Sequence, residues 1–289
     1  MALLGGPPAD PRRSFAGMVG NALTARGYLC RPDGDAVHIE FPQRGVLGLA
    51  NVWQLCLAAP PREWPRIVER FLDSVLPGLE PAPHEDLDTV LPALRVRVMP
   101  EDEGEGRHRP SLAARPLADG LRAVLAVDRP TMVELVPAAR LARWAASEDE
   151  LFAAGYTNVR HEPEPQLSVA PVEEGVLLTR VWGESFYTAT WVRWLADLLG
   201  PFPPGGALVA LPTRHALVVH PIAGVHAVNA VQPLSAVAAQ AHRAGPGSLS
   251  PHVYWWRDGS LRRLPLAVKA GGFRFHPPDD FLDALNGAA

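Results

Sequence analysis

The stretch Ala207-Leu-Val-Ala-Leu-Pro-Thr-Arg-His-Ala-Leu-Val-Val219 decides the fold of this chain. Two apolar runs, 208–211 and 216–219, flank a break at Pro212-Thr-Arg214. Short apolar runs bounded by turn residues are typical of buried strands. The stretch therefore predicts two buried strands joined by a turn. Its polar break also leaves it too short to cross a membrane, which takes about 20 apolar residues.

Further strands are expected on both sides of this stretch. Asp258-Gly259 separates Val253-Tyr-Trp-Trp256 from the apolar segment 261–268. Asp-Gly tolerates positive φ, so a hairpin is predicted there. Towards the N-terminus, residues 35–41 alternate as a strand, with Val37, Ile39 and Phe41 on one side, and 46–57 is a strand or a strand leading into a helix. Other apolar strands are predicted at 121–127, 132–136, 167–172 and 175–181.

Helices are expected between these strands. Ser147-Glu-Asp-Glu150 is a capping box, in which each end can satisfy a free amide of the first helical turn, and it begins a helix that runs to about Asn158. Helical spacing predicts further helices at 14–26, 61–76, 137–145, 188–199 and 232–243. Because strands and helices mix without regular βαβ alternation, we expect an α+β fold. Its sheets are expected to be mixed and largely antiparallel, with helices packed on one side.

The chain is expected to form two α+β lobes. Residues 101–111 are polar and rich in glycine, which is typical of a loop or linker. The predicted organisation is a flexible tail at 1–11, an N-terminal lobe at 12–100, the loop at 101–111, a C-terminal lobe at 112–272 and a tail at 273–289.

Composition bounds the class of protein. The chain has 289 residues, 47% of them hydrophobic, and a formal net charge of −4, so it can bury a core. No basic stripe with interleaved aromatic residues occurs, which argues against a nucleic-acid partner. Cys30 and Cys56 are the only cysteines and form no CxxC motif, so we expect both to be reduced. Without a signal-like or membrane-spanning segment, a cytoplasmic location with no membrane partner is expected.

Several short motifs in the C-terminal part follow one another in a characteristic order. They are Asp128 after a strand, Trp144 before a capped helix, Asn158 and Arg160 at the end of that helix, Gly183-Glu-Ser-Phe-Tyr187, and Pro212-Thr-Arg-His215 between two strands. This order resembles the YtpQ-like family, a bacterial domain of unknown function. The resemblance implies an α+β fold and carries over no activity, because the family itself has none assigned.

Arg214 and His215 begin a strand and carry the most suggestive chemistry. A half-buried arginine needs a partner, so Arg214 is expected to pair with Asp128 or Glu184, or else to bind an anion or a partner. Asp128 at a strand end is typical of a turn, and Glu184 is favourable near the positive end of the helix that Ser185 or Thr188 can cap.

Recognised catalytic and metal motifs are absent from the sequence, including GxSxG, the P-loop, GxGxxG and HExxH. His215 and His220 are five residues apart, so on a regular strand they face opposite sides, which disfavours a metal site. We predict no catalytic residue, no metal and no cofactor. In the strand Tyr254-Trp-Trp256, Trp255 lies on the opposite face from its two neighbours and is a candidate for an exposed contact. The binding candidates are Asp128, Arg160, Glu184, Tyr187, Arg214, His215 and Trp255.

Three functions remain open. The favoured hypothesis is a non-catalytic protein that acts through protein–protein binding, as an accessory or immunity-like protein. The rival is a hydrolase or other enzyme with a nonstandard site at Asp128, Glu184, Arg214 and His215. The third is a small-ligand sensor. A cleft that gathers those four residues would favour the enzyme or sensor, whereas their dispersal, with Trp255 on an open apolar patch, would favour the binding protein.

Overall fold

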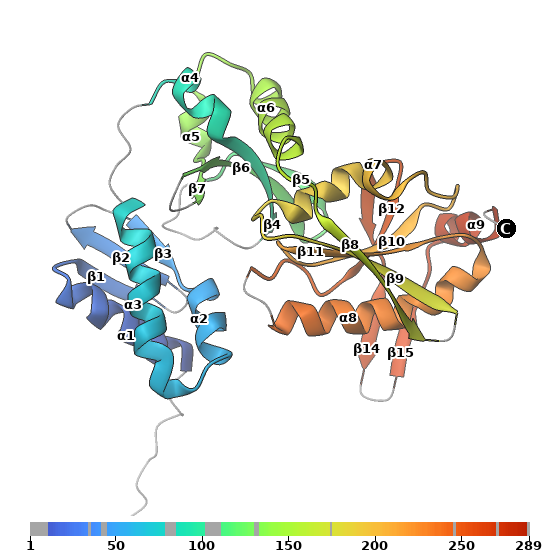
Figure 1. Cartoon of the computed structure of the whole chain (residues 1–289), viewed down its shortest axis with the longest axis horizontal. Helices are drawn as coiled ribbons and strands as arrows, with labels where there is room; N and C mark the ends of the chain where they lie inside the picture. The colour runs from blue at the N-terminus through green and yellow to red at the C-terminus, as the bar shows by residue number, and fades with distance from the viewer. Residues whose placement is uncertain are drawn as a thin grey trace, which may run out of the picture. The chain divides into compact units, whose positions relative to one another are not determined.

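The computed structural model describes most of the chain, namely residues 11–33, 36–41, 45–78, 85–101, 111–129, 133–173, 175–244, 247–269 and 272–287. The chain divides into two compact units, which Figure 1 shows in one colour series from the N-terminus to the C-terminus. One unit comprises Met1–Glu85 with Arg129–Met132, and the other Asp86–Asp128 with Val133–Ala289. Both combine helices with antiparallel strands, so the predicted α+β fold class is confirmed.

The first unit is a three-stranded antiparallel sheet with helices packed against it. Its strands, in spatial order, are β1 (Leu29–Asp33), β2 (Ala36–Phe41) and β3 (Gly45–Gly48). Its helices are α1 (Pro11–Ala25), α2 (Ala50–Leu57) and α3 (Trp64–Val75), the last preceded by a 3₁₀ turn. Val37 and Ile39 face the core, whereas Phe41 at the end of β2 is 61% exposed.

The boundary between the units differs from the predicted one. The sequence placed 12–100 in one lobe, but β4 (Leu94–Pro100) pairs along its whole length with β6 (Leu121–Asp128) inside the second unit. The second unit therefore begins at Asp86, because the partner strand of β4 lies beyond residues 101–111, the predicted loop or linker. Residues 1–10 of the expected tail and 102–110 of the expected loop lie outside the described residues.

A small sheet and one long helix form the first part of the second unit. In this sheet β6 lies between β4 and β5 (Ala114–Ala118), and β7 (Val133–Leu135) also pairs with it. The helix α6 (Glu148–Arg160) covers one face and buries Leu151 and Phe152 against it. Gly155 of α6 allows this close approach, because a Cβ there would lie 3.1 Å from the backbone carbon of Arg95.

The helix α6 begins as the sequence predicts. Ser147 Oγ accepts a hydrogen bond from the Glu150 amide at 3.3 Å, and the Ser147 amide donates to a Glu150 carboxylate oxygen at 2.7 Å. The capping box is thereby confirmed, and it fixes the first turn. Upstream, the helix predicted over 137–145 is only the single turn α5 (Ala138–Leu141), and a short helix α4 (Leu87–Val90) precedes β4.

A six-stranded antiparallel sheet forms the rest of the second unit. Its strand order is β13-β12-β10-β11-β9-β8. The strands are β8 (Gln166–Glu173), β9 (Val176–Trp182), β10 (Ala207–Thr213), β11 (Ala216–Pro221), β12 (Val253–Arg257) and β13 (Ser260–Arg263). The predicted strands at 208–211 and 216–219 are β10 and β11, and both are buried. At the predicted hairpin turn, Asp258 and Gly259 have φ of +50° and +77°.

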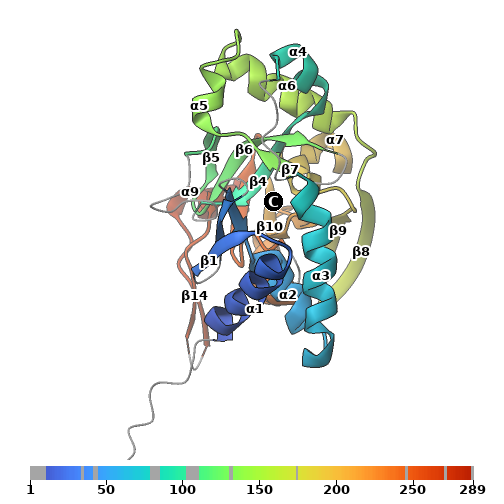
Figure 2. The ribbon, with the colours of Figure 1, turned by 90° about the vertical axis from the view of Figure 1, so that its left-hand side faces the viewer.

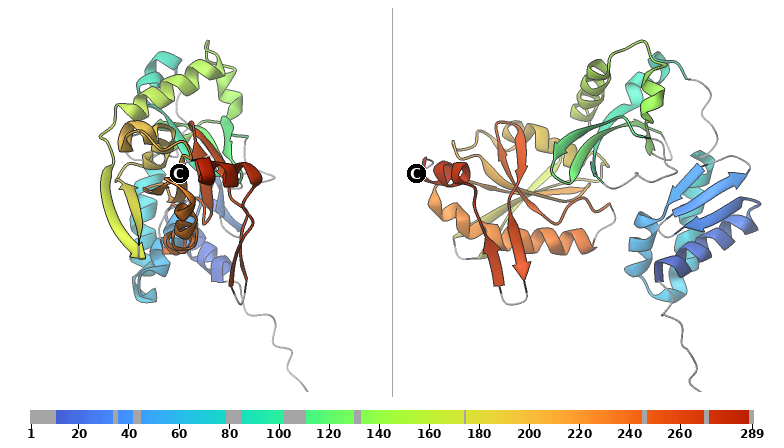
Figure 3. Two further views of the ribbon diagram at one scale, coloured as in Figure 1. Left: turned by 90° about the vertical axis from the view of Figure 1, so that its right-hand side faces the viewer. Right: turned by 180° about the vertical axis from the view of Figure 1, so that it is seen from behind.

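Helices cover both faces of this sheet, not one side as predicted. On one face lie the 3₁₀ helix η4 (Thr188–Trp194) and α7 (Leu195–Leu199), with Trp191 and Leu195 packed on β10 and β11. On the other face lie α8 (Val231–Ala244) and α9 (Asp279–Gly287), as Figure 3 also shows. The helix predicted over 188–199 is thus a 3₁₀ helix for most of its length.

The prediction of a C-terminal tail over 273–289 is wrong. The strand β15 (Gly272–Phe275) pairs with β14 (Leu266–Lys269), and α9 follows. Phe281 of α9 is fully buried, and its ring centroid lies 5.3 Å from that of Trp255. The helix α9 therefore belongs to the core. Among the described residues, no helix has both the length and the apolar character needed to cross a bilayer.

Candidate functional site

Tyr187 and Asp128 form the centre of a polar cluster, which we define as Asp128, Glu162, Ser185, Tyr187, Arg214 and His215. The Tyr187 hydroxyl donates a hydrogen bond to Asp128 Oδ1 at 3.1 Å, and the Tyr187 side chain is 2% exposed. Burial, followed by the charge of Asp128, raises the pKa of Tyr187 far above its usual value. The phenol therefore stays protonated and acts as a fixed donor, not as a base.

Ser185 joins this pair to the end of α6. Its hydroxyl donates to Glu162 Oε2 at 2.6 Å and accepts from the Tyr187 amide at 3.0 Å. The other oxygen of Glu162 accepts from Arg95 Nε at 2.9 Å. Ser185 thus fixes the turn before η4. The predicted capping by Ser185 or Thr188 is wrong, because the N-cap of η4 is Tyr187 and makes no side-chain cap bond. Glu184 is exposed to solvent.

Arg214 and His215 lie on the turn between β10 and β11, against the same 183–189 segment. Arg214 Nε donates to His215 Nε2 at 2.9 Å, and the guanidinium lies 4.3 Å from the ring centroid of Phe186. Arg214 is 7% exposed. It also contacts Gly247, where a Cβ would lie only 2.7 Å from Arg214 Nε. Imidazole, aromatic ring and glycine are neighbours that the sequence did not predict for Arg214.

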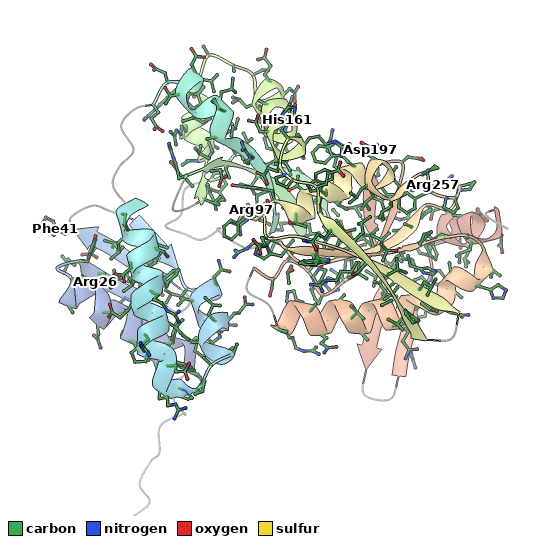
Figure 4. All side chains as sticks on the ribbon, viewed as in Figure 1. Arg26, Phe41, Arg97, His161, Asp197 and Arg257 are labelled. Carbon is green, nitrogen blue, oxygen red and sulfur yellow. The ribbon has the colours of Figure 1, made fainter. Side chains whose placement is uncertain are left out.

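The imidazole of His215 is neutral near pH 7. Burial and then the charge of Arg214 lower its pKa below the usual value. The charge of Arg97, which β4 carries and Figure 4 labels, acts on both His215 and Tyr187. Four of the predicted candidates, Asp128, Tyr187, Arg214 and His215, therefore lie in one neighbourhood, and each forms contacts within the protein.

Arg160, the last residue of α6, links that helix to η4 and α7 on the six-stranded sheet. It bonds to Asp197 Oδ2 at 3.0 Å, and its guanidinium lies 4.9 Å from the ring centroid of Trp191 and 5.6 Å from that of Trp194. Figure 4 labels Asp197 on α7. These contacts join two helices, so the predicted binding role of Arg160 has a structural alternative.

Trp255 is not on an open apolar patch. Its side chain is 6% exposed, its indole nitrogen donates to the Gly205 carbonyl at 2.8 Å, and Phe281 packs on its ring. The prediction that Trp255 marks an interface is corrected by α9, which covers Trp255 and lies within the predicted C-terminal tail. Within the described ranges, no three His, Cys, Asp or Glu side chains gather in a way that could hold a metal.

Sequence reasoning missed three exposed apolar residues that lie together in the second unit. Leu167, Val169 and Leu177, on the β8–β9 hairpin, are 47%, 61% and 55% exposed. Figure 2 shows β8 as the outermost strand beyond β9. The available signal was the run Gln166-Leu-Ser-Val-Ala-Pro-Val172, which carries no charge, but its position at an edge follows only from the strand order.

Comparisons with protein-family models, with curated proteins and with solved structures gave no match.

Proposed function

We propose that this chain is a non-catalytic protein that binds another protein through the outer strand of its six-stranded sheet. The observation that carries the proposal is β8, whose residues 166–172 are all exposed. A sheet edge leaves backbone donors and acceptors available, and a partner can use them by adding a strand. Exposed Val169 and Leu177 beside that edge would add apolar contact area.

The polar cluster supports this reading in a second way. Tyr187 is held as a donor to Asp128, and His215 accepts a hydrogen bond from Arg214. A general base needs a free lone pair directed at a substrate, and a nucleophile needs an adjacent base. Because these side chains already satisfy one another, a structural role in joining η4 to the two sheets accounts for them.

Membership of the YtpQ-like family and a cytoplasmic location are part of the proposal. The order of the motifs from Asp128 to His215 supports the first. The second is supported by Cys30 and Cys56, which are both free thiols. An accessory or immunity-like role is the subclass that we favour.

The test is affinity capture with a matched set of variants. The wild-type chain and Val225→Lys, which changes a 50%-exposed valine elsewhere in the same unit, are expected to recover the same partner. Val169→Lys and Leu177→Lys are expected to lose it, because a lysine places charge on the apolar edge. Equal recovery by all four proteins would contradict the proposed binding surface.

An enzyme is the second candidate, and the gathering of Asp128, Arg214 and His215 near Tyr187 favours it. Its test is a panel of ester, amide and phosphate substrates. Turnover by the wild-type chain that His215→Gln abolishes, without loss of folding measured by circular dichroism, would replace the binding proposal with the enzyme.

A further inference from the structure

The two edges of the six-stranded sheet are protected to different degrees. The edge strand β13 has four residues, lies beside β5, and carries Arg262, which pairs with Asp280 of α9 at 2.7 Å. The edge strand β8 has eight residues and pairs only with β9 among the described strands. Native proteins normally shorten, charge, cover or kink an edge strand. In β8, Pro171 and the irregularity between Pro171 and Glu173 do this at one end only, which leaves Gln166–Ala170 as the open part of the edge.

The outer strand β8 is also uncharged up to its last residue, Glu173. Between Gln166 and Val172 there is no Asp, Glu, Lys or Arg, although 20% of the chain is charged. A charged edge repels an identical strand and selects a partner of opposite charge. A neutral edge does neither, so it can meet its own copy without repulsion.

The side chains of β8 are arranged so that one face is apolar. Leu167 lies opposite Val181, Val169 opposite Thr179, and Pro171 opposite Leu177 in the β8–β9 register. Directly opposite residues share a face, so Leu167, Val169 and Leu177 form one exposed apolar stripe. On the other face, Gln166, Ser168 and Ala170 are small or polar.

We propose that β8 pairs antiparallel with β8 of a second copy of this chain, which joins two six-stranded sheets into one. The inference rests on the proposed function and names the occupant of the same edge. Pro171 has no amide hydrogen, so the pairing covers Gln166–Ala170, with the two-fold axis at Ser168. That register places Leu167 of each copy opposite Val169 of the other and Ser168 opposite itself.

The residue types that meet across this axis suit self-pairing. A two-fold contact uses the same patch on both copies, and only a patch that complements itself can do so. With the axis at Ser168, two Leu–Val pairs form across the interface on the apolar face. Two Gln–Ala pairs form on the other face. Side chains directly opposite each other in an antiparallel pair are in contact, and no like charges meet in this register.

The first experiment measures the mass of the full chain by light scattering from micromolar to millimolar concentration. We expect a species of twice 31.2 kDa that dissociates on dilution. Val169→Lys is expected to remain at one chain at every concentration, and Val225→Lys to dimerise as the wild type does. A wild-type chain that stays monomeric throughout, or a Val169→Lys dimer, overturns the inference.

The second experiment fixes the register without destabilising the fold. In a Cys30→Ser background, Ser168→Cys is expected to form an interchain disulfide on mild oxidation, because the two sulfurs meet at the axis. Gln166→Cys, equally exposed but four residues from its symmetric position, is expected not to cross-link. The reverse result overturns the proposed axis. If the wild type is monomeric but capture of another protein still depends on Val169, self-pairing fails while the proposed function stands.

Discussion

The polar cluster and the β8 edge of the second unit differ in both composition and exposure. The cluster holds the chain's most suggestive chemical groups, yet Tyr187 and Arg214 are 2% and 7% exposed and bond within the protein. The β8 edge has no ionisable group from Gln166 to Val172, and all of these residues are exposed. In this protein the chemically suggestive residue types lie where polar side chains are buried and bonded to one another. The exposed edge is identified by the strand order and not by its residue types.

The largest effect is expected from Arg214→Met, which tests whether the cluster is structural. Methionine removes the guanidinium that donates to His215 and packs on Phe186. The buried His215 Nε2 then lacks this donor, which costs about 1–3 kcal/mol, and the lost cation–π contact adds about 0.5–2 kcal/mol. We expect the free energy of unfolding in urea to fall by more than about 2 kcal/mol. Arg180→Met, an exposed arginine that stacks on Trp182, is the control and is expected to cost less than about 1 kcal/mol. An unchanged stability for Arg214→Met would return Arg214 to the list of ligand-binding candidates.

Tyr187→Phe should have the next largest effect. It removes the hydrogen bond to Asp128, and a hydrogen bond to a charged group contributes about 1.5–3 kcal/mol. Because the pKa of Tyr187 is raised in the folded state, its contribution is full below about pH 10 and is lost as pH rises further. The stability difference between wild type and variant should therefore shrink in alkaline urea titrations. A difference that grows with pH would show that the phenol is not the donor.

A smaller effect is expected from His215→Gln, and it depends on pH. The pKa of His215 is lowered in the folded state, so the unfolded chain takes up a proton first as pH falls below about 6.5. Wild-type stability is full above that pH and is lost as pH falls towards the folded-state pKa. The variant should show a shallower acid loss in thermal unfolding curves, with His226→Gln as the exposed control. Parallel curves for wild type and His215→Gln would mean that His215 is not buried as a neutral ring.

The smallest effect on a single chain is expected at the β8 edge. Val169→Lys changes an exposed side chain, so its unfolding free energy at high dilution should stay within about 0.5 kcal/mol of wild type. At higher concentration the wild-type denaturation midpoint should rise, because association stabilises the folded state, whereas the variant midpoint should not move. A large loss at high dilution would mean that Val169 serves the core, and the contrast between the two regions would then fail.

Local signals in the sequence predicted local structure well. The capping box from Ser147 to Glu150, the Asp258-Gly259 turn and the strands within 207–219 are all present, since each depends on neighbours a few residues away. Contacts between distant residues were not predictable in the same way. Tyr187 and Asp128 are 59 positions apart, and no propensity connects them.

The errors in the site share one physical cause, which is that burial depends on contacts between segments distant in the sequence. The sequence predicts a tail from residue 273 and so leaves Trp255 as an interface candidate, but α9 lies within that predicted tail and covers Trp255. The apolar run at 166–172 could have been a central strand or an edge strand from its sequence alone. Only the order β13-β12-β10-β11-β9-β8 shows that it is exposed.

That strand order also has a consequence for how the chain folds. The sheet is three sequence-local hairpins, β8–β9, β10–β11 and β12–β13, set side by side through the longer-range pairs β9–β11 and β10–β12. Local hairpins close in microseconds, while pairing over longer loops is slower. We expect β8 to be available for intermolecular pairing before the six-stranded sheet is complete. The edge that pairs two folded chains would therefore also allow partly folded chains to pair incorrectly during synthesis.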